Sequence, residues 1–276
     1  MPFFDQHVHS EASIDGHFPM EVMTKSAIAR GLSSVTFTDH CDLIYSDKAN
    51  VPDPRCHEFW SGCRNAYSRV KEAYGSEIDL RIGMELGEIN QDPETAAKCY
   101  ATEGLDLVLG SVHAVRGHMD FYLLDYQDQE EAVALVSQYL DESIEMARLG
   151  FFDVMAHLGY TIRYMAPHGI DVDFRPFEGK LRALFAILIG EGRGLELNTS
   201  GLRQGVGAMF PTEYIMRLYR DCGGEIVTLG SDAHIPDHIG AHFDAGIALL
   251  KRIGFTKLAH YRAHQLLFID IEGDLI

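Results

Sequence analysis

The sequence predicts an α/β fold, a single-domain distorted (β/α)7 barrel related to the TIM barrel. Seven short apolar runs alternate with longer amphipathic segments, which is typical of parallel strands buried on both faces. Nearly every run delivers a His, Asp or Glu at its carboxyl end, where barrels of this class carry their active sites. An open doubly wound sheet has the same local signals. It should also have a glycine-rich phosphate loop after the first strand, and Ser10–Asp15 is not one.

The predicted strands are short, and each reads as nearly continuous apolar sequence. They are Phe3–His9, Val35–Asp39, Leu80–Ile89, Leu107–His113, Phe152–His157, Leu195–Asn198 and Ile226–Ser231.

The predicted helices are marked by proline near their starts and glycine after their ends, as Pro19 and Gly31 mark the first. They are Glu21–Arg30, Glu58–Tyr74, Glu130–Leu149, Leu181–Ile189, Thr212–Cys222 and Ala241–Ile253.

The charge balance excludes several classes of function. The chain of 276 residues has 23 Lys and Arg and 41 Asp and Glu, so its formal charge is 23 − 41 = −18. A hydrophobic fraction of 46% with 23% charged residues indicates a folded protein rather than a disordered one. A general binder of nucleic acid or of an anionic membrane needs a basic face, so we expect neither partner. A local basic pocket for a small anion remains compatible with this balance.

The cysteines and the apolar runs predict a cytoplasmic protein. The 5 cysteines, at 41, 56, 63, 99 and 222, form no CxxC pair, which argues against a disulfide framework or a Cys-rich zinc site and favours a reducing compartment. The amino-terminal residues show no signal peptide. The longest apolar run, Leu184–Ile189, is far too short to cross a bilayer.

Histidine is abundant, with 14 residues, and many of them lie at strand ends beside carboxylates. This residue set without cysteine suits Zn²⁺, Mn²⁺ or Fe. His7 and His9 are two apart on a strand and therefore point the same way, as do Asp232 and His234. Each of these motifs, taken alone, more often consists of hydrogen-bonded core or surface residues than of metal ligands. Together they are too many for one tetrahedral ion, and without metal they would leave many buried polar groups unpaired, so we expect two or three divalent ions.

These residues resemble the PHP (polymerase and histidinol phosphatase) family of metal-dependent phosphoesterases. The stretch 196–203 is similar to the histidinol-phosphate phosphatase branch. The motifs that carry the resemblance, in order, are HVHS at 7–10, Asp15-Gly16, TDH at 38–40, Glu85 after Gly83, GSVH at 110–113, AH at 156–157 and SDAH at 231–234.

The resemblance implies a distorted (β/α)7 barrel that holds up to three metal ions. Glu85 would bridge the first two ions, and either Asp15 or His17 could serve the third, with Asp15 favoured. The implied ligands are His7, His9, Glu85 and Asp232 for the first ion, Glu85, His113 and His157 for the second, and Asp15, His40 and His234 for the third.

The implied activity is hydrolysis of a small phosphomonoester, foremost L-histidinol phosphate of histidine biosynthesis, with inorganic phosphate as product. A metal-bridging hydroxide would attack phosphorus in line, and Asp232 and His234 are candidates for protonating the leaving group. Phosphate favours Arg, and we expect Arg203 and Arg163 before Arg116. Candidates for contacting the rest of the substrate are Glu11, Glu88 and Asp120 for its cationic groups, and His118.

Three other functions compete with this hypothesis: a PHP phosphoesterase acting on another small phosphate or a nucleotide, an amidohydrolase-like enzyme, and a non-catalytic metal-holding domain. An amidohydrolase usually carries a carboxylated Lys at a strand end, and none of the seven ends has a Lys. A purely structural metal site tends to be closed, which fits poorly with candidate phosphate-binding arginines. The oligomeric state stays open.

Overall fold

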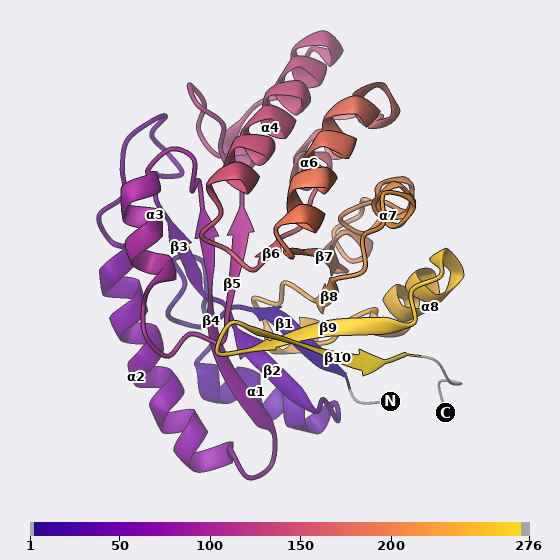
Figure 1. Cartoon of the computed structure of the whole chain (residues 1–276). Helices are drawn as coiled ribbons and strands as arrows, with labels where there is room; N and C mark the ends of the chain where they lie inside the picture. Colours follow the sequence, from indigo (N-terminus) through magenta and orange to yellow (C-terminus); the bar gives the residue numbers. More distant parts are fainter. Residues whose placement is uncertain (1–2, 272–276) are drawn as a thin grey trace.

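The computed structural model of the chain describes residues 3–271, apart from the side chains of residues 56–59. Seven parallel strands follow one another around a barrel, and each overlaps a predicted strand (Figure 1). A short β3 (His40–Asp42) pairs with the second half of β4. The barrel strands, in spatial order, are β1 (Phe4–Val8), β2 (Ser34–Phe37), β4 (Asp79–Gly87), β5 (Leu107–Ser111), β6 (Val154–Met155), β7 (Gly194–Asn198) and β8 (Val227–Gly230).

The first and last strands meet and close the barrel. The amide of Asp232 donates to the carbonyl of His7 at 2.8 Å, and the amide of His9 donates to the carbonyl of Ala233 at 2.9 Å. An open doubly wound sheet would keep these two strands apart. The predicted (β/α)7 barrel is therefore confirmed.

The helices cover the outside of the barrel, and their packing against the strands forms the main apolar core (Figure 1). All six predicted helices are present with slightly different ends, while α3 and the short α5 were not predicted. Asp92 caps α3 by accepting from the amide of Thr95. The helices are α1 (Met20–Ala29), α2 (Cys56–Tyr74), α3 (Pro93–Tyr100), α4 (Gln129–Leu149), the short α5 (Tyr160–Met165), α6 (Glu178–Gly190), α7 (Glu213–Asp221) and α8 (Phe243–Ile253).

A carboxyl-terminal hairpin, β9 (Lys257–Arg262) and β10 (Gln265–Asp270), crosses the amino ends of the barrel strands. This hairpin was not predicted from the sequence. Ala259 and Tyr261 pack with Leu107 and Leu109 inside the barrel, and Gln6 donates to the carbonyl of Ala259 at 2.8 Å. We call this end of the barrel the floor and the opposite end the mouth.

β1 has an irregular register between Asp5 and Val8, and the adjacent side chains of Gln6 and His7 reach opposite ends of the barrel. Gln6 binds the floor hairpin, while His7 lies in the polar cluster at the mouth. A regular strand would send neighbouring side chains to opposite faces.

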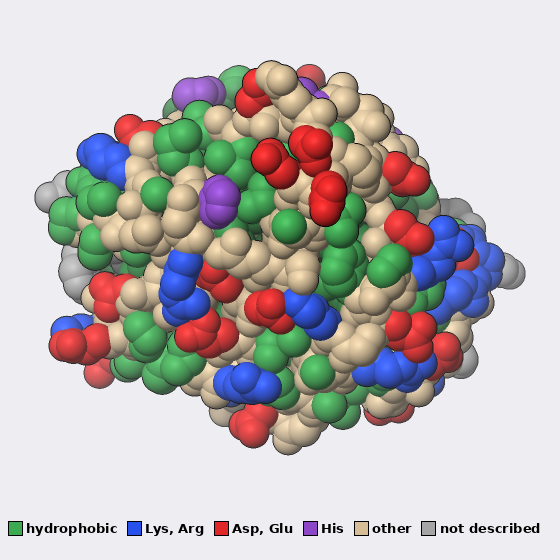
Figure 2. All heavy atoms as spheres, turned by 90° about the horizontal axis from the view of Figure 1, so that it is seen from above, with side chains coloured by type: hydrophobic (Ala, Val, Ile, Leu, Met, Phe, Trp, Pro, Cys, Tyr) green, Lys and Arg blue, Asp and Glu red, His purple; other side chains and the backbone are tan. Residues whose placement is uncertain are grey.

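The remaining predictions concern the cysteines, membrane-spanning helices and surface charge. Cys41 is disulfide-bonded, whereas Cys63 and Cys222 are free. The side chains of Cys56 and His57 lie outside the described residues. Among described residues, none of the helices has the length and apolarity needed to span a bilayer. On the face in Figure 2, basic side chains are interspersed with acidic ones.

Candidate metal centre and active site

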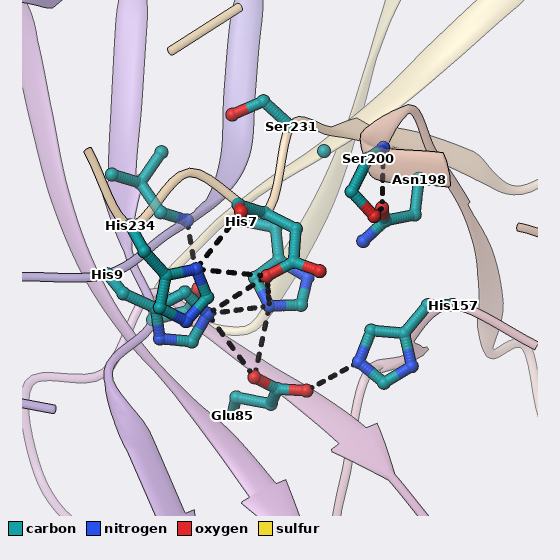
Figure 3. Close-up of polar contacts among 12 residues, drawn as sticks. His7, His9, Glu85, His157, Asn198, Ser200, Ser231 and His234 are labelled. Atoms are coloured by element: carbon teal, nitrogen blue, oxygen red, sulfur yellow. Dashed lines mark hydrogen bonds and ion pairs between the residues drawn. The ribbon is translucent and has the colours of Figure 1, made fainter. Parts of the chain in front are cut away.

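The mouth of the barrel gathers all of the predicted metal ligands into one cluster, although they come from strand ends and loops far apart in the sequence. In Figure 3, the imidazoles of His7, His9 and His234 lie together, and Glu85 and His157 face one another. The cluster consists of His7, His9, Asp15, His40, Glu85, His113, His157, Asp232 and His234.

The first group is fully buried. Nε2 of His7 lies 3.1 Å from Nε2 of His9, and Oε2 of Glu85 lies 3.1 Å from the former and 3.4 Å from the latter. Oδ1 of Asp232 completes the group at 3.8 and 3.5 Å from the same two nitrogens. Two imidazoles and two carboxylates thus converge on one small volume.

The second group uses the other oxygen of the same glutamate. Oε1 of Glu85 lies 3.0 Å from Nε2 of His113 and 2.7 Å from Nε2 of His157, and these nitrogens are 3.4 Å apart. Glu85 therefore stands between the two groups with one oxygen in each, the geometry required of a bridging ligand.

The third group lies toward solvent. Oδ2 of Asp15 is 2.9 Å from Nε2 of His234 and 3.7 Å from Nε2 of His40. The ring of His9 stacks on both of these rings, with centroids 4.4 Å from His40 and 4.1 Å from His234. His17 is exposed and belongs to none of the ligand groups found among the described residues, so the geometry favours Asp15 at this position.

The hydrogen bonds around the first group test whether a cation fits. Nδ1 of His7 faces Oε1 of Glu196 at 2.8 Å, and Nδ1 of His9 faces the Ser13 hydroxyl at 2.9 Å, whose proton goes to Asp39. If each Nδ1 carries the ring proton, both Nε2 lone pairs point at the Glu85 carboxylate. Acceptors facing acceptors repel one another unless a cation lies between them, so the donor set fits divalent metal.

The titration behaviour reflects this crowding. Burial works against protonation of His7, but the carboxylates of Glu196 and Glu85 outweigh it and hold the pKa of His7 well above its ordinary value. Burial and the neighbouring histidines lower the pKa of His9 to about 3. The histidines around Glu85 hold the pKa of that carboxyl well below its usual range despite burial.

Local backbone features place these side chains. Asp232 has φ of 55° and His157 has φ of 21°, both in the left-handed region that costs energy for residues other than glycine. Gly230 leaves room beneath the cluster, because a Cβ there would lie 2.0 Å from Oε1 of Glu196. Asp232 and Gly230 thereby lie where β8 and its loop approach β1 and β7.

A cavity of about 400 Å³ lies over the cluster, and it is lined by ligand candidates, tyrosines, Arg163 and acids. Nη2 of Arg163 donates to Oδ2 of Asp232 at 2.7 Å, and the guanidinium lies against the rings of Tyr160 and Phe210 at 5.1 and 5.3 Å. Nε of Arg163 is buried without a hydrogen-bond partner among the described residues, which leaves a donor for an anion. The neighbouring Asp232 carboxylate helps to raise the pKa of Arg163 against the effect of burial.

The other two predicted arginines are placed differently. Nη2 of Arg203 donates to the backbone carbonyl of Asp232 at 2.6 Å, and its buried Nη1 has no hydrogen-bond partner among the described residues. Arg116 instead pairs with Glu145 and donates to the carbonyl of Asn90, and it does not line the cavity.

Of the three acids considered for the substrate's cationic end, only Asp120 lines the cavity. Glu11 accepts from the amide of Met20 at the start of α1. Glu88 accepts from the amides of His113 and Ala114 at 2.7 and 3.1 Å, so it supports the backbone of a ligand candidate. His118 does not line the cavity either.

Sequence reasoning assigned no role to Asp42 and Glu196. Oδ1 of Asp42 lies 3.1 Å from Nδ1 of His113, and Asp42 forms a further ligand group with His40 and His113. A signal existed, since Asp42 follows His40 at the same two-residue spacing as His9 follows His7. For Glu196, whose partner His7 is 189 positions away, no local pattern pointed to the contact.

Comparison with known proteins identifies the family. The PHP domain model matches residues 5–200. The chain belongs to the PHP domain family. Its relatives include a probable histidinol-phosphatase of Thermotoga maritima, 27% identical over 92% of this chain and 94% of the relative. Another is the histidinol-phosphatase of Lactococcus lactis, 25% identical over 96% and 97%.

A solved structure shares the fold of this PHP protein. It is the histidinol phosphate phosphatase of Lactococcus lactis, crystallised with zinc, L-histidinol and phosphate. The two structures superpose with a TM-score of 0.79 over 96% of this chain and 98% of the other, at 23% sequence identity. The likeness therefore extends beyond the residues that the family model matches.

Proposed function

We propose that this protein is a metal-dependent histidinol-phosphatase, which hydrolyses L-histidinol phosphate to L-histidinol and inorganic phosphate in histidine biosynthesis. The observation that carries the proposal is the convergence of a multi-ligand metal cluster and Arg163 on one cavity. The whole-length similarity to relatives named for this activity supports the choice of substrate.

Two or three divalent ions would be held by the three groups: His7, His9, Glu85 and Asp232 would hold one, Glu85, His113 and His157 a second, and Asp15, His40 and His234 a third. Zinc, manganese and iron all suit this set of imidazoles and carboxylates. When bound, such cations supply an acidified water near neutral pH and neutralise charge on the phosphoryl oxygens. Asp232 and His234 both line the cavity and are our candidates for passing a proton to the leaving alkoxide.

For the phosphoryl group, we assign Arg163 as the main protein contact. Its guanidinium lines the cavity, where Asp232 and two aromatic rings hold it, and it keeps an unused buried donor. A planar guanidinium can bind two phosphate oxygens at once. Arg203, which has a spare buried Nη1 behind Asp232, is the second candidate.

For the cationic end of the substrate, we assign Asp120. The Tyr160 ring packs against His113 and His157, with centroids 4.8 and 5.1 Å away, while its hydroxyl donates to Asp120 at 3.2 Å. Asp120 therefore lies about one aromatic side chain away from the metal ligands. Asp53, another acid of the cavity, is already paired with Arg55.

The test is phosphate release by the metal-replete enzyme from a panel of L-histidinol phosphate, p-nitrophenyl phosphate and nucleoside monophosphates. We expect the highest kcat/KM for L-histidinol phosphate, with loss of activity on chelation and recovery on adding Zn²⁺ or Mn²⁺. A clear preference for a nucleotide would overturn the substrate, and an inert metal-loaded protein would overturn the enzymatic function. Deaminase or deacetylase activity without phosphatase activity would indicate amidohydrolase-like chemistry.

A further inference from the structure

A continuous series of buried hydrogen bonds joins His7 to Arg163 through the end of β7. Oε1 of Glu196 lies 2.8 Å from Nδ1 of His7, and Oε2 accepts from Nδ2 of Asn198 at 3.1 Å. Oδ1 of Asn198 accepts from the Ser200 hydroxyl at 2.5 Å. The oxygen of that hydroxyl accepts from Nη2 of Arg163 at 2.6 Å.

The direction of these bonds follows from chemistry. A guanidinium can only donate, so the Ser200 oxygen accepts from Arg163 and its own proton goes to Oδ1 of Asn198. The amide nitrogen of Asn198 then faces Glu196, as observed. Every proton in the series points toward the Glu196 carboxylate, and aligned bonds of this kind strengthen one another.

The middle of the series is rigid. The side chains of Asn198 and Ser200 are fully buried. The backbone of Asn198 exchanges two hydrogen bonds with Phe210, at 2.7 and 2.9 Å, and its Oδ1 also accepts from the amide of Ser200. Figure 3 shows Ser200 and Asn198 next to each other on this turn. The acceptor presented to Arg163 is therefore fixed by the barrel itself.

Arg163, by contrast, lies on the short helix α5 outside the strands. Its polar contacts among the described residues are Ser200 and Asp232, both through Nη2. Because Asp232 is also a candidate metal ligand, its carboxylate cannot be tuned for holding an arginine alone. Ser200 is the contact that is free to set the orientation of the guanidinium.

We propose that Asn198 and Ser200 are positioning residues that hold Arg163 ready for the phosphoryl group, with Glu196 as the fixed end of the series. The proposal rests on the proposed phosphatase function, since it assumes that Arg163 binds phosphate. The residues act through Arg163 and need not touch the substrate.

Ser200→Ala in the metal-loaded enzyme tests the proposal. Loss of the acceptor should raise KM for L-histidinol phosphate and the inhibition constant of inorganic phosphate by about tenfold each, as expected for a hydrogen bond to a charged group. Bound metal, measured by elemental analysis, should stay unchanged. Ser143→Ala is the matched control, because Ser143 is equally buried and donates to the carbonyl of Tyr139 in α4, away from the cavity.

A double-mutant cycle with Arg163→Ala separates positioning from other effects. In the Arg163→Ala background, Ser200→Ala should change neither constant further. Additive losses, or unchanged constants in Ser200→Ala, would overturn the positioning role. If Arg163→Ala itself leaves both constants unchanged, the phosphate role of Arg163 in the proposed function fails instead.

Asn198→Ala serves as a second variant should Ser200→Ala fold poorly. It keeps the Ser200 hydroxyl but removes the acceptor that orients it. The two constants should rise together, as in Ser200→Ala. A soluble, metal-loaded Asn198→Ala enzyme with wild-type constants would also overturn the proposal.

Discussion

The mouth and the floor of the barrel both bury charged groups and histidines, yet the two ends use them differently. At the floor, Arg81 donates to Asp79 at 2.8 and 3.0 Å, to the carbonyl of Tyr261 at 2.7 Å, and faces Nδ1 of His260 at 2.8 Å. At the mouth, the Nε2 atoms of His7 and His9 face Glu85 and one another, while their Nδ1 atoms face Glu196 and Ser13.

The difference lies in the direction of the donors rather than in burial. Arg81 is only 4% exposed, but its donors face acceptors, so the buried polar groups around it need no added cation. Around Glu85, acceptors meet acceptors, and only an added cation or extra protons can relieve the repulsion. Buried histidines therefore indicate a metal centre when their remaining partners cannot supply the missing positive charge.

We expect the largest effect from a substitution at the mouth of the barrel. Glu85→Gln keeps the size of the side chain but removes the charge that joins the first two ligand groups. We expect kcat/KM to fall by about 10³-fold or more, since bound metal contributes several kcal/mol to such reactions. Elemental analysis should show reduced metal content.

The metal-free Glu85→Gln protein provides the control. Its thermal unfolding near neutral pH should stay cooperative but occur at a lower temperature than that of metal-free wild type, because the surrounding histidines stabilise the ionised Glu85 carboxylate. A metal-free variant that does not fold at all would mean that Glu85 is required for the fold itself.

We expect the next largest effect from a substitution at the floor of the barrel. Arg81→Met should lower the free energy of unfolding by about 2–3 kcal/mol, because the carbonyl of Tyr261 and the ring of His260 lose their donor. Urea unfolding measures this loss. Below the unfolding transition, kcat/KM should stay within about twofold of wild type, and a tenfold loss in the folded variant would show that the two ends are coupled.

The substitution Asp120→Asn tests how the charge of a buried cavity acid affects stability. Burial raises the pKa of Asp120 to about 6. Because this pKa lies above the ordinary value of 3.8, the folded state holds the proton more tightly, and that stabilisation is lost as pH rises through 6. We expect Asp120→Asn to be more stable than wild type at pH 8, by roughly 1–3 kcal/mol, and the difference to vanish near pH 4.

The same substitution should weaken binding of a cationic substrate. At pH 8 we expect KM for L-histidinol phosphate to rise about tenfold in Asp120→Asn, with KM for p-nitrophenyl phosphate unchanged. The ratio of the two enzymes' KM values should approach one as pH falls below 6, since wild-type Asp120 then becomes neutral. A ratio that does not change with pH would assign the cationic end to another group.

The ligands at the mouth were predictable because parallel strands deliver their carboxyl ends to one rim, so His7, Glu85 and Asp232 could be placed together without knowing the loops. The floor hairpin was not predictable in this way. Its strands cover a barrel end rather than join the parallel order, and Gln6 contacts it from a part of β1 where the register is irregular.

The sequence also did not predict which of the loop arginines point into the cavity. Arg163, Arg203 and Arg116 all follow strand ends, yet chain distance from a ligand does not say which way a loop turns. Arg163 is turned inward by the short helix α5 and held by Asp232, whereas Arg116 is drawn outward by Glu145 on α4. The partners that decided between them are Asp232, in the loop after β8, and Glu145, on α4.

Arg116→Ala carries the smallest expected effect and checks this assignment. Its pair with Glu145 is largely exposed, at 44% and 45%, and exposed pairs contribute at most about 1 kcal/mol to stability. We expect KM for L-histidinol phosphate and inhibition by phosphate to change less than about twofold. Arg163→Ala, assayed in parallel, should change both constants by at least tenfold. Equal effects from the two substitutions would mean that the loop after β5 folds over the cavity when substrate binds and that Arg116 leaves Glu145 to reach the phosphoryl group.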